Sequence, residues 1–145
     1  MSRHTITSGL DALFLRRMAA RLDRGAAAAV RGHGLTVDQW RMLDLLASTG
    51  PLPMAALCEE LSLAGATATR VADRLVVEAL AYRSIDDTDR RRVVLGASER
   101  GLELREQLSA EVERAQTQQL DTLGETDRGR LVRMLDSVAE RSDTA

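Results

Sequence analysis

Apolar residues recur at helical spacing through most of this 145-residue chain, and that periodicity constrains the fold more than any other feature. Aliphatic stripes predict helices over residues 10–30, 36–48, 54–60 and 64–79, a long helix after Ser98, and a last helix around 131–138. Only residues 82–85 and 92–95 have a strand-forming composition, and the polar segment 86–91 between them predicts a small hairpin. The predicted fold class is therefore mainly α, with one β-hairpin.

Local signals mark where the predicted helices begin and end. Residues 1–9 have no helical pattern and are expected to form a loose arm. The Gly32-His33-Gly34 triplet ends the first helix, and Thr36 with Gln39 three residues later has the form of a capping box. The segment 48–53, with one glycine and two prolines, ends the second helix. We find no internal repeat, and the length fits one domain.

Composition excludes several classes of protein. Hydrophobic residues make up 44% and charged residues 29% of the chain, as in globular proteins. Only three residues are aromatic, so the core must be aliphatic and few rings are available to stack on unpaired bases. A single cysteine, Cys58, and two histidines cannot supply the usual zinc ligands, and no cofactor motif is present. No apolar stretch reaches membrane-spanning length, so a cytoplasmic protein is expected.

Because acidic and basic residues are nearly equal in number, any binding to a polyanion must depend on where the arginines lie in the structure. The net charge is −2, and all twenty basic residues are arginine. Residues 64–92 contain six arginines and five acidic residues, which leaves that segment only one positive charge in excess. Its affinity for DNA of arbitrary sequence should therefore be modest.

The centre of the chain has the order of a winged helix-turn-helix: a short helix, a tight link, a polar-faced helix and a basic hairpin. The second helix of such a pair enters the major groove, and its N-terminal residues touch base edges. Thr67, Thr69 and Arg70 are placed to do so, and Arg70 is the best candidate for direct reading of a base. We refer to residues 64–79 as the recognition helix and to the hairpin as the wing.

The wing tip carries three arginines beside three carboxylates, over residues 86–92. Arg91 is expected to enter the minor groove, where the potential is negative, with Asp89 holding its guanidinium in position. A solvated loop with weak ion pairs is the alternative. Arg74 could equally pair with Asp73, Asp87 or Asp89. The candidate DNA-contacting residues are Thr67, Thr69, Arg70, Arg74, Asp89, Arg90, Arg91 and Arg92.

Four segments in register resemble the MarR family (multiple-antibiotic-resistance type) of transcriptional regulators. They are Leu35-Thr-Val-Asp-Gln-Trp40, Ala66-Thr-Ala-Thr-Arg-Val-Ala-Asp-Arg-Leu75, Asp89-Arg-Arg-Arg-Val-Val-Leu95 and Ser98-Glu-Arg-Gly101. The resemblance implies a homodimer joined by its first and last helices, a pseudo-palindromic DNA operator, and often a small-molecule pocket. Residues 1–34 and 98–145 would then form a helical dimerisation region and residues 35–97 the DNA-binding region of one intertwined domain.

The chain also departs from the family pattern. Ala64 and Gly65 stand where the family usually has a capping serine and a polar or basic residue. Ala64 gives up about 1 kcal/mol of helix stability, and Gly65 has no side chain to reach DNA. Asp87 replaces a common proline in the wing. These changes imply a shifted sequence preference and weaker operator binding.

A ligand pocket between the first, second and fifth helices could be lined by Phe14, Met18 and Trp40. Arg17, Arg21 or His33 could then anchor an anionic aromatic compound, although packing in the core is the default role for residues on an apolar stripe. Cys58 is expected to be a buried, inert residue of the third helix, because a reactive thiol needs exposure.

These features predict a sequence-specific regulator that binds double-stranded DNA, acts as a repressor and is released by a small molecule. The alternative is a dimeric winged-helix interaction module that has lost DNA binding, as Gly65 and the net acidity could suggest. No P-loop, dinucleotide-binding glycine pattern or nucleophile elbow is present, so an enzyme is not expected.

Overall fold

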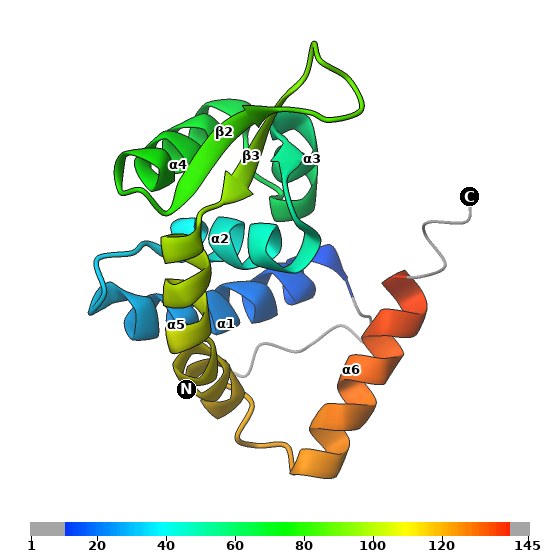
Figure 1. Cartoon of the computed structure of the whole chain (residues 1–145). Helices are drawn as coiled ribbons and strands as arrows, with labels where there is room; N and C mark the ends of the chain where they lie inside the picture. Colours follow the sequence, from blue (N-terminus) through cyan, green and yellow to red (C-terminus); the bar gives the residue numbers. More distant parts are fainter. Residues whose placement is uncertain (1–10, 140–145) are drawn as a thin grey trace.

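In the computed structural model, which describes residues 11–139, the chain forms six helices and one three-stranded sheet (Figure 1). The helices are α1 (Ala12–Arg31), α2 (Val37–Thr49), α3 (Met54–Leu61), α4 (Gly65–Val77), α5 (Glu99–Gln118) and α6 (Glu125–Ala139). The strands are β1 (Leu52–Pro53), β2 (Ala81–Ile85) and β3 (Val93–Ala97). The mainly helical class with a winged helix-turn-helix at its centre is confirmed.

Side-chain caps set the ends of several helices. Thr36 Oγ1 accepts from the backbone N–H of Gln39 at 3.2 Å, and Gln39 Oε1 accepts from the N–H of Thr36 at 2.8 Å, which confirms the capping box of α2. Ser98 caps α5 as expected, since its hydroxyl accepts from the N–H of Gly101 at 3.0 Å. Asp11, to which we assigned no cap, accepts from the N–H of Phe14 and begins α1.

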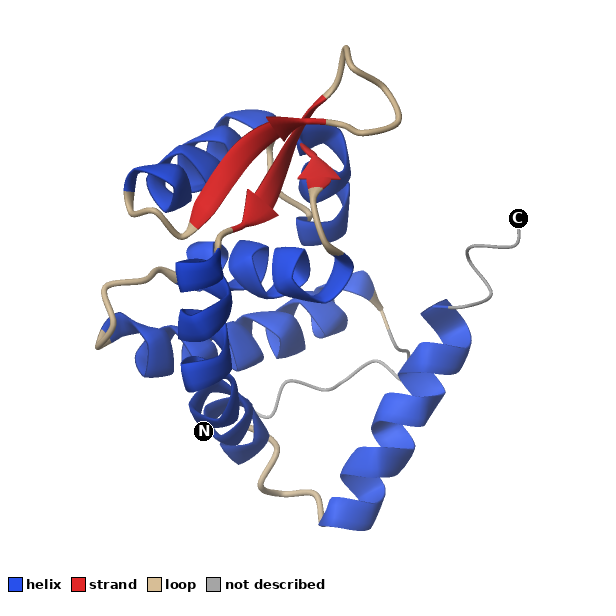
Figure 2. Cartoon of the chain, viewed as in Figure 1, coloured by secondary structure: helices blue, strands red, loops and turns tan. Residues whose placement is uncertain are grey.

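The sheet is antiparallel in the order β1-β3-β2, and Figure 2 shows it packed beside α3 and α4. The hairpin pairs Ile85 with Val93 at the wing end and Ala81 with Ala97 at the base. Strand β1 was not predicted, because Pro53 and the preceding Pro51 signal the end of a helix more strongly than a strand. As a two-residue edge strand it tolerates Pro53, which has no N–H to donate to a second neighbour.

Helix α4 ends earlier than the sequence pattern suggested. The apolar stripe continues to Ala79, but that residue has a φ of +58°, in the left-handed region, and Glu78 forms the C-cap. The N–H of Leu80 donates to the carbonyl of Leu75 at 2.8 Å and closes the turn. This early stop lets the chain turn directly into β2.

The core is aliphatic, as predicted, and α2 runs through its middle. Met42, Leu43 and Leu46 of α2 are fully or almost fully buried, together with side chains from α3, α4, β3 and α5. Trp40 is also buried, which agrees with its default core role. Cys58 packs against this core but is half-buried, so the expectation that it is a buried residue was wrong. The arm over residues 1–9 lies outside the described residues.

The terminal helices are less well packed than the centre of the chain. The second half of α1 packs along α5, whereas Leu13, Phe14 and Leu15 in its first half are exposed. Helix α6 stands apart from the other helices (Figure 1) and contains no buried residue. Its apolar residues Val132, Met134, Leu135 and Val138 are exposed. The single chain therefore leaves an apolar surface on these two helices.

Gly101, in the first turn of α5, lies against the chain reversal between α4 and β2. A Cβ atom there would be 2.0 Å from the carbonyl oxygen of Leu80, which is backbone and cannot swing away. Gly101→Ala is expected to reduce the free energy of unfolding by about 1–3 kcal/mol, as overpacking does. Urea unfolding followed by circular dichroism measures this change.

Gly65→Ala provides the control, because a Cβ atom on Gly65 would meet nothing within 4 Å and alanine favours a helix. That variant is expected to be as stable as the wild type or slightly more so. Equal stability of the two variants would contradict the close approach at Gly101.

Candidate nucleic-acid interface

The position of α4 determines which of its side chains can meet a ligand. Ala68, Ala72 and Leu75 are fully buried against the rest of the helix-turn-helix. The opposite side presents Thr69, Arg70 and Arg74 to solvent, while Thr67 is half-buried. The link before α4 is tight because Ser62 takes the left-handed conformation and closes the end of α3.

The first turn of α4 has the two departures that the sequence suggested. Ala64 has an extended backbone and provides no side-chain cap. The space around Gly65 is open, since a Cβ atom added there would have no heavy atom within 4 Å. The N-terminus of α4 therefore offers backbone N–H groups but no side chain from these two positions.

Two of the exposed arginines near α4 are held by carboxylates. Arg74 Nε donates to Glu78 Oε1 at 2.8 Å, so none of the three partners that we considered for Arg74 is correct. Asp73 instead binds Arg83 of β2 and so joins the recognition helix to the wing. Arg70 makes only a long contact, 3.5 Å, with the hydroxyl of Thr67.

The wing tip is ordered by its own carboxylates. Asp86 accepts from the hydroxyl of Thr88 at 2.7 Å and from its N–H at 2.8 Å, and these bonds, with Arg92 nearby, hold the pKa of Asp86 below its ordinary value. Asp89 Oδ1 accepts from the backbone N–H of Arg91 at 3.0 Å and lies 3.6 Å from Arg91 Nε. The Arg91 side chain is 94% exposed. Asp89 therefore contacts Arg91 as expected, with the guanidinium left open to solvent.

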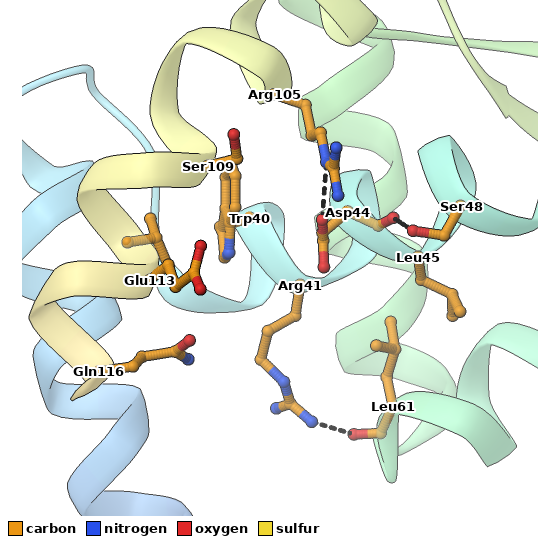
Figure 3. Close-up of a pocket in the computed structure, with 11 residues that line it drawn as sticks. Trp40, Arg41, Asp44, Leu45, Ser48, Leu61, Arg105, Ser109, Glu113 and Gln116 are labelled. Carbon is orange, nitrogen blue, oxygen red and sulfur yellow. Dashed lines mark hydrogen bonds and ion pairs between the residues drawn. The ribbon is translucent and has the colours of Figure 1, made fainter. Parts of the chain in front are cut away.

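The three predicted ligand-lining residues do not share one cavity. Trp40 lines a cavity of about 460 Å³ between α2 and α5 (Figure 3). Phe14 and Met18 line a second cavity, of about 800 Å³, between α1, the end of α5 and α6. His33 lines a third one against α5, and Arg17 and Arg21 line neither of the first two. The grouping was wrong because α1 presents Phe14 and Met18 toward α6 and away from α2.

The cavity between α2 and α5 contains charged residues that sequence reasoning missed. Arg105 Nε of α5 donates to Asp44 Oδ1 of α2 at 2.8 Å, and Arg41 Nη2 donates to the carbonyl of Leu61 at 3.0 Å (Figure 3). Asp44 and Arg105 are 61 residues apart, so no local pattern could have paired them. This cavity thus combines a tryptophan with two arginines.

Two other features, a cluster of metal ligands and a membrane-spanning helix, are not found in the part of the chain that the structure covers. Within residues 11–139, no three His, Cys, Asp or Glu side chains lie close enough together to hold a metal ion. None of the helices described is both long enough and apolar enough to cross a membrane.

Comparisons with known proteins place the chain in a family. A model of the MarR family matches residues 33–92. The chain is 30% identical to a probable transcriptional regulator from Pseudomonas aeruginosa, with 86% of this chain and 93% of that one covered and a TM-score of 0.70. No curated protein matches it in sequence.

Two further solved structures share the fold. BpsR of Bordetella bronchiseptica, whose DNA binding is regulated by 6-hydroxynicotinic acid, is 22% identical over 95% of this chain and 98% of that one, with a TM-score of 0.74. A MarR-family protein of Mycobacterium tuberculosis in complex with p-aminosalicylic acid is 22% identical over 90% and 99%, with a TM-score of 0.77. The chain belongs to the MarR family of transcriptional regulators, which bind DNA and are not enzymes.

Proposed function

We propose that the chain is a homodimeric repressor that binds a pseudo-palindromic operator and is released by an anionic aromatic compound in the cytoplasm. The observation that carries the DNA-binding part is the pair of accessible guanidinium groups, Arg70 on α4 and Arg91 on the wing. Helix α4 and the wing lie together at one end of the molecule (Figure 1). One arginine is thus available to each groove of a single duplex.

The proposed roles follow from groove chemistry. Arg70, one turn into α4, grips the two acceptors of a guanine in the major groove, and Thr67 and Thr69 contact phosphates or base edges. Arg91 enters the minor groove with Asp89 beside it, and Arg90 and Arg92 contact the flanking phosphates. Arg74 takes part only if it leaves Glu78.

The DNA-binding proposal is tested with an operator selected from genomic DNA by the purified protein. Arg70→Ala and Arg91→Ala are each expected to weaken operator binding by about 1–3 kcal/mol, roughly 5- to 150-fold, because each removes a groove contact. Fluorescence anisotropy on the selected duplex measures the affinities.

Arg114→Ala on α5 provides the control and should bind the operator like the wild type. If the wild type selects no fragment and binds no duplex, the interaction module without DNA binding becomes the better description.

The homodimer is proposed from the apolar surface of the terminal helices. Leu135 of α6 is 44% exposed and faces Phe14, Leu15 and Met18 of α1 across the 800 Å³ cavity. An apolar helix that packs on little of its own chain gains stability by burial against a second copy. We accordingly propose residues 1–34 and 98–145 as the dimerisation region and residues 35–97 as the DNA-reading region.

Leu135→Asp places a charge in the centre of this apolar surface and is expected to convert the dimer to a monomer, since burying an unpaired carboxylate is costly. Analytical ultracentrifugation distinguishes the two states. Asp136→Lys, a charge change on the same helix outside the cavity, should remain dimeric. A wild type that is monomeric at micromolar concentration would refute the dimer.

The effector site is proposed in the cavity between α2 and α5. Trp40 lines the cavity with the small exposed part of its ring, and Arg105, which pairs with Asp44 and lies 3.8 Å from Glu106, keeps 32% of its side chain exposed. The ligands named for two structural relatives, 6-hydroxynicotinic acid and p-aminosalicylic acid, are aromatic carboxylic acids and match this chemistry. Phe14 and Met18 stay candidates only for a ligand that binds across the dimer.

Calorimetric titration of the dimer with p-aminosalicylate and 6-hydroxynicotinate is expected to give heat with at least one of them, and Arg105→Ala should abolish it by removing the carboxylate's partner. Arg114→Ala should leave the heat unchanged. No heat with either acid, or full binding by the Arg105 variant, would rule out this assignment.

A further inference from the structure

Four of the arginines of α4 and the wing, Arg70, Arg74, Arg83 and Arg91, fall into two groups by the contacts that they make. Arg70 and Arg91 have only the long contacts already described, of 3.5 Å to a hydroxyl and 3.6 Å to Asp89. Arg74 and Arg83 instead form close ion pairs, with Glu78 at 2.8 Å and with Asp73. Half of these four cations are therefore already neutralised within the protein.

Arg74 lies where a phosphate contact would be expected. It follows Arg70 by four residues, so both side chains lie on the same exposed side of α4. Arg74 is 66% exposed and Glu78 only 27%, which means that the carboxylate is the better-anchored partner and draws the guanidinium along the helix surface. Glu78 thus competes directly with a DNA phosphate for Arg74.

Helix stability does not account for Glu78. It stands at the C-cap of α4, where the helix dipole disfavours a carboxylate, and the first turn of α4 has no acidic residue. The order of the pair, arginine four residues before glutamate, is also the less favourable one for a helix. The pair with Arg74 therefore adds little stability to the helix, which favours a role in binding.

We propose that Glu78 determines DNA specificity by withholding Arg74 from the phosphate backbone. Contacts to phosphate strengthen binding to every sequence equally, whereas groove contacts by Arg70 and Arg91 distinguish sequences. Neutralising inside the protein a cation that would otherwise contact a DNA phosphate lowers affinity for arbitrary DNA and so increases the ratio of specific to non-specific binding. The inference rests on the proposed DNA-binding function.

The test compares Glu78→Gln with the wild type on a random-sequence duplex and on the selected operator at several salt concentrations. Freed Arg74 should add one phosphate contact in each protomer, two in the dimer, which steepens the plot of log affinity against log salt by about 1.8. Between 50 and 200 mM salt, the variant's advantage on random DNA should therefore shrink by about 12-fold. The preference for the operator over random DNA should fall.

Two controls separate this effect from a general loss of negative charge. Glu59→Gln removes an exposed carboxylate of α3 that takes no part in either ion pair and should leave the slope unchanged. Glu78→Gln combined with Arg74→Gln should return the slope to the wild-type value.

The outcomes are distinct. A wild type that binds no duplex at any salt would refute the proposed function and this inference with it. Operator binding by the wild type with an unchanged slope in Glu78→Gln would refute the inference alone. So would an equal steepening in Glu59→Gln, or a slope that stays steep when Arg74 is also replaced.

Discussion

The burial of three small or aliphatic residues on one side of α4 is the constraint on which the DNA-reading surface depends. Ala68, Ala72 and Leu75 have no exposed surface, and the alanines bring the helix backbone close to its neighbours. That packing fixes the rotation of α4 about its axis and so points Arg70 and Arg74 outward. A larger residue at either alanine would push α4 out of place and misdirect both arginines.

The positions of the charged residues matter more in this protein than the net charge, because basic and acidic residues are nearly equal in number. The chain has twenty arginines and twenty-two acidic residues, and several of the arginines form ion pairs within the protein. Asp73 joins α4 to β2 through Arg83, and Asp44 joins α2 to α5 through Arg105. An arginine with a carboxylate nearby on another element therefore holds the two elements together, whereas an arginine without one, such as Arg70, stays available to a ligand.

The outer helices differ in how fully they pack on their own chain. Helices α1 and α5 pack along one another closely enough that a Cβ on Gly25 would lie 2.7 Å from the carbonyl oxygen of Ala115. Helix α6, in contrast, extends away with its apolar residues exposed. A rigid core with an unburied apolar helix is the arrangement in which association with a second copy completes the hydrophobic burial. The effector site that we propose between α2 and α5 and the proposed DNA-reading end would then be connected through α5.

Local sequence determined the parts of this protein that depend on near neighbours. The periodic stripes, the Thr36–Gln39 box and the Ser98 cap depend on neighbouring residues, so the helices could be predicted from them, and the hairpin from the strand-forming runs around residues 86–91. The family was predicted from the resemblance of four segments to the MarR pattern. Contacts between distant segments were decided by the tertiary structure: the pairing of β1, the division of Phe14 and Trp40 between two cavities, and the Asp44–Arg105 pair across 61 residues. Even Arg74, four residues from Glu78, needed coordinates, because several carboxylates lie within reach and only packing selects one.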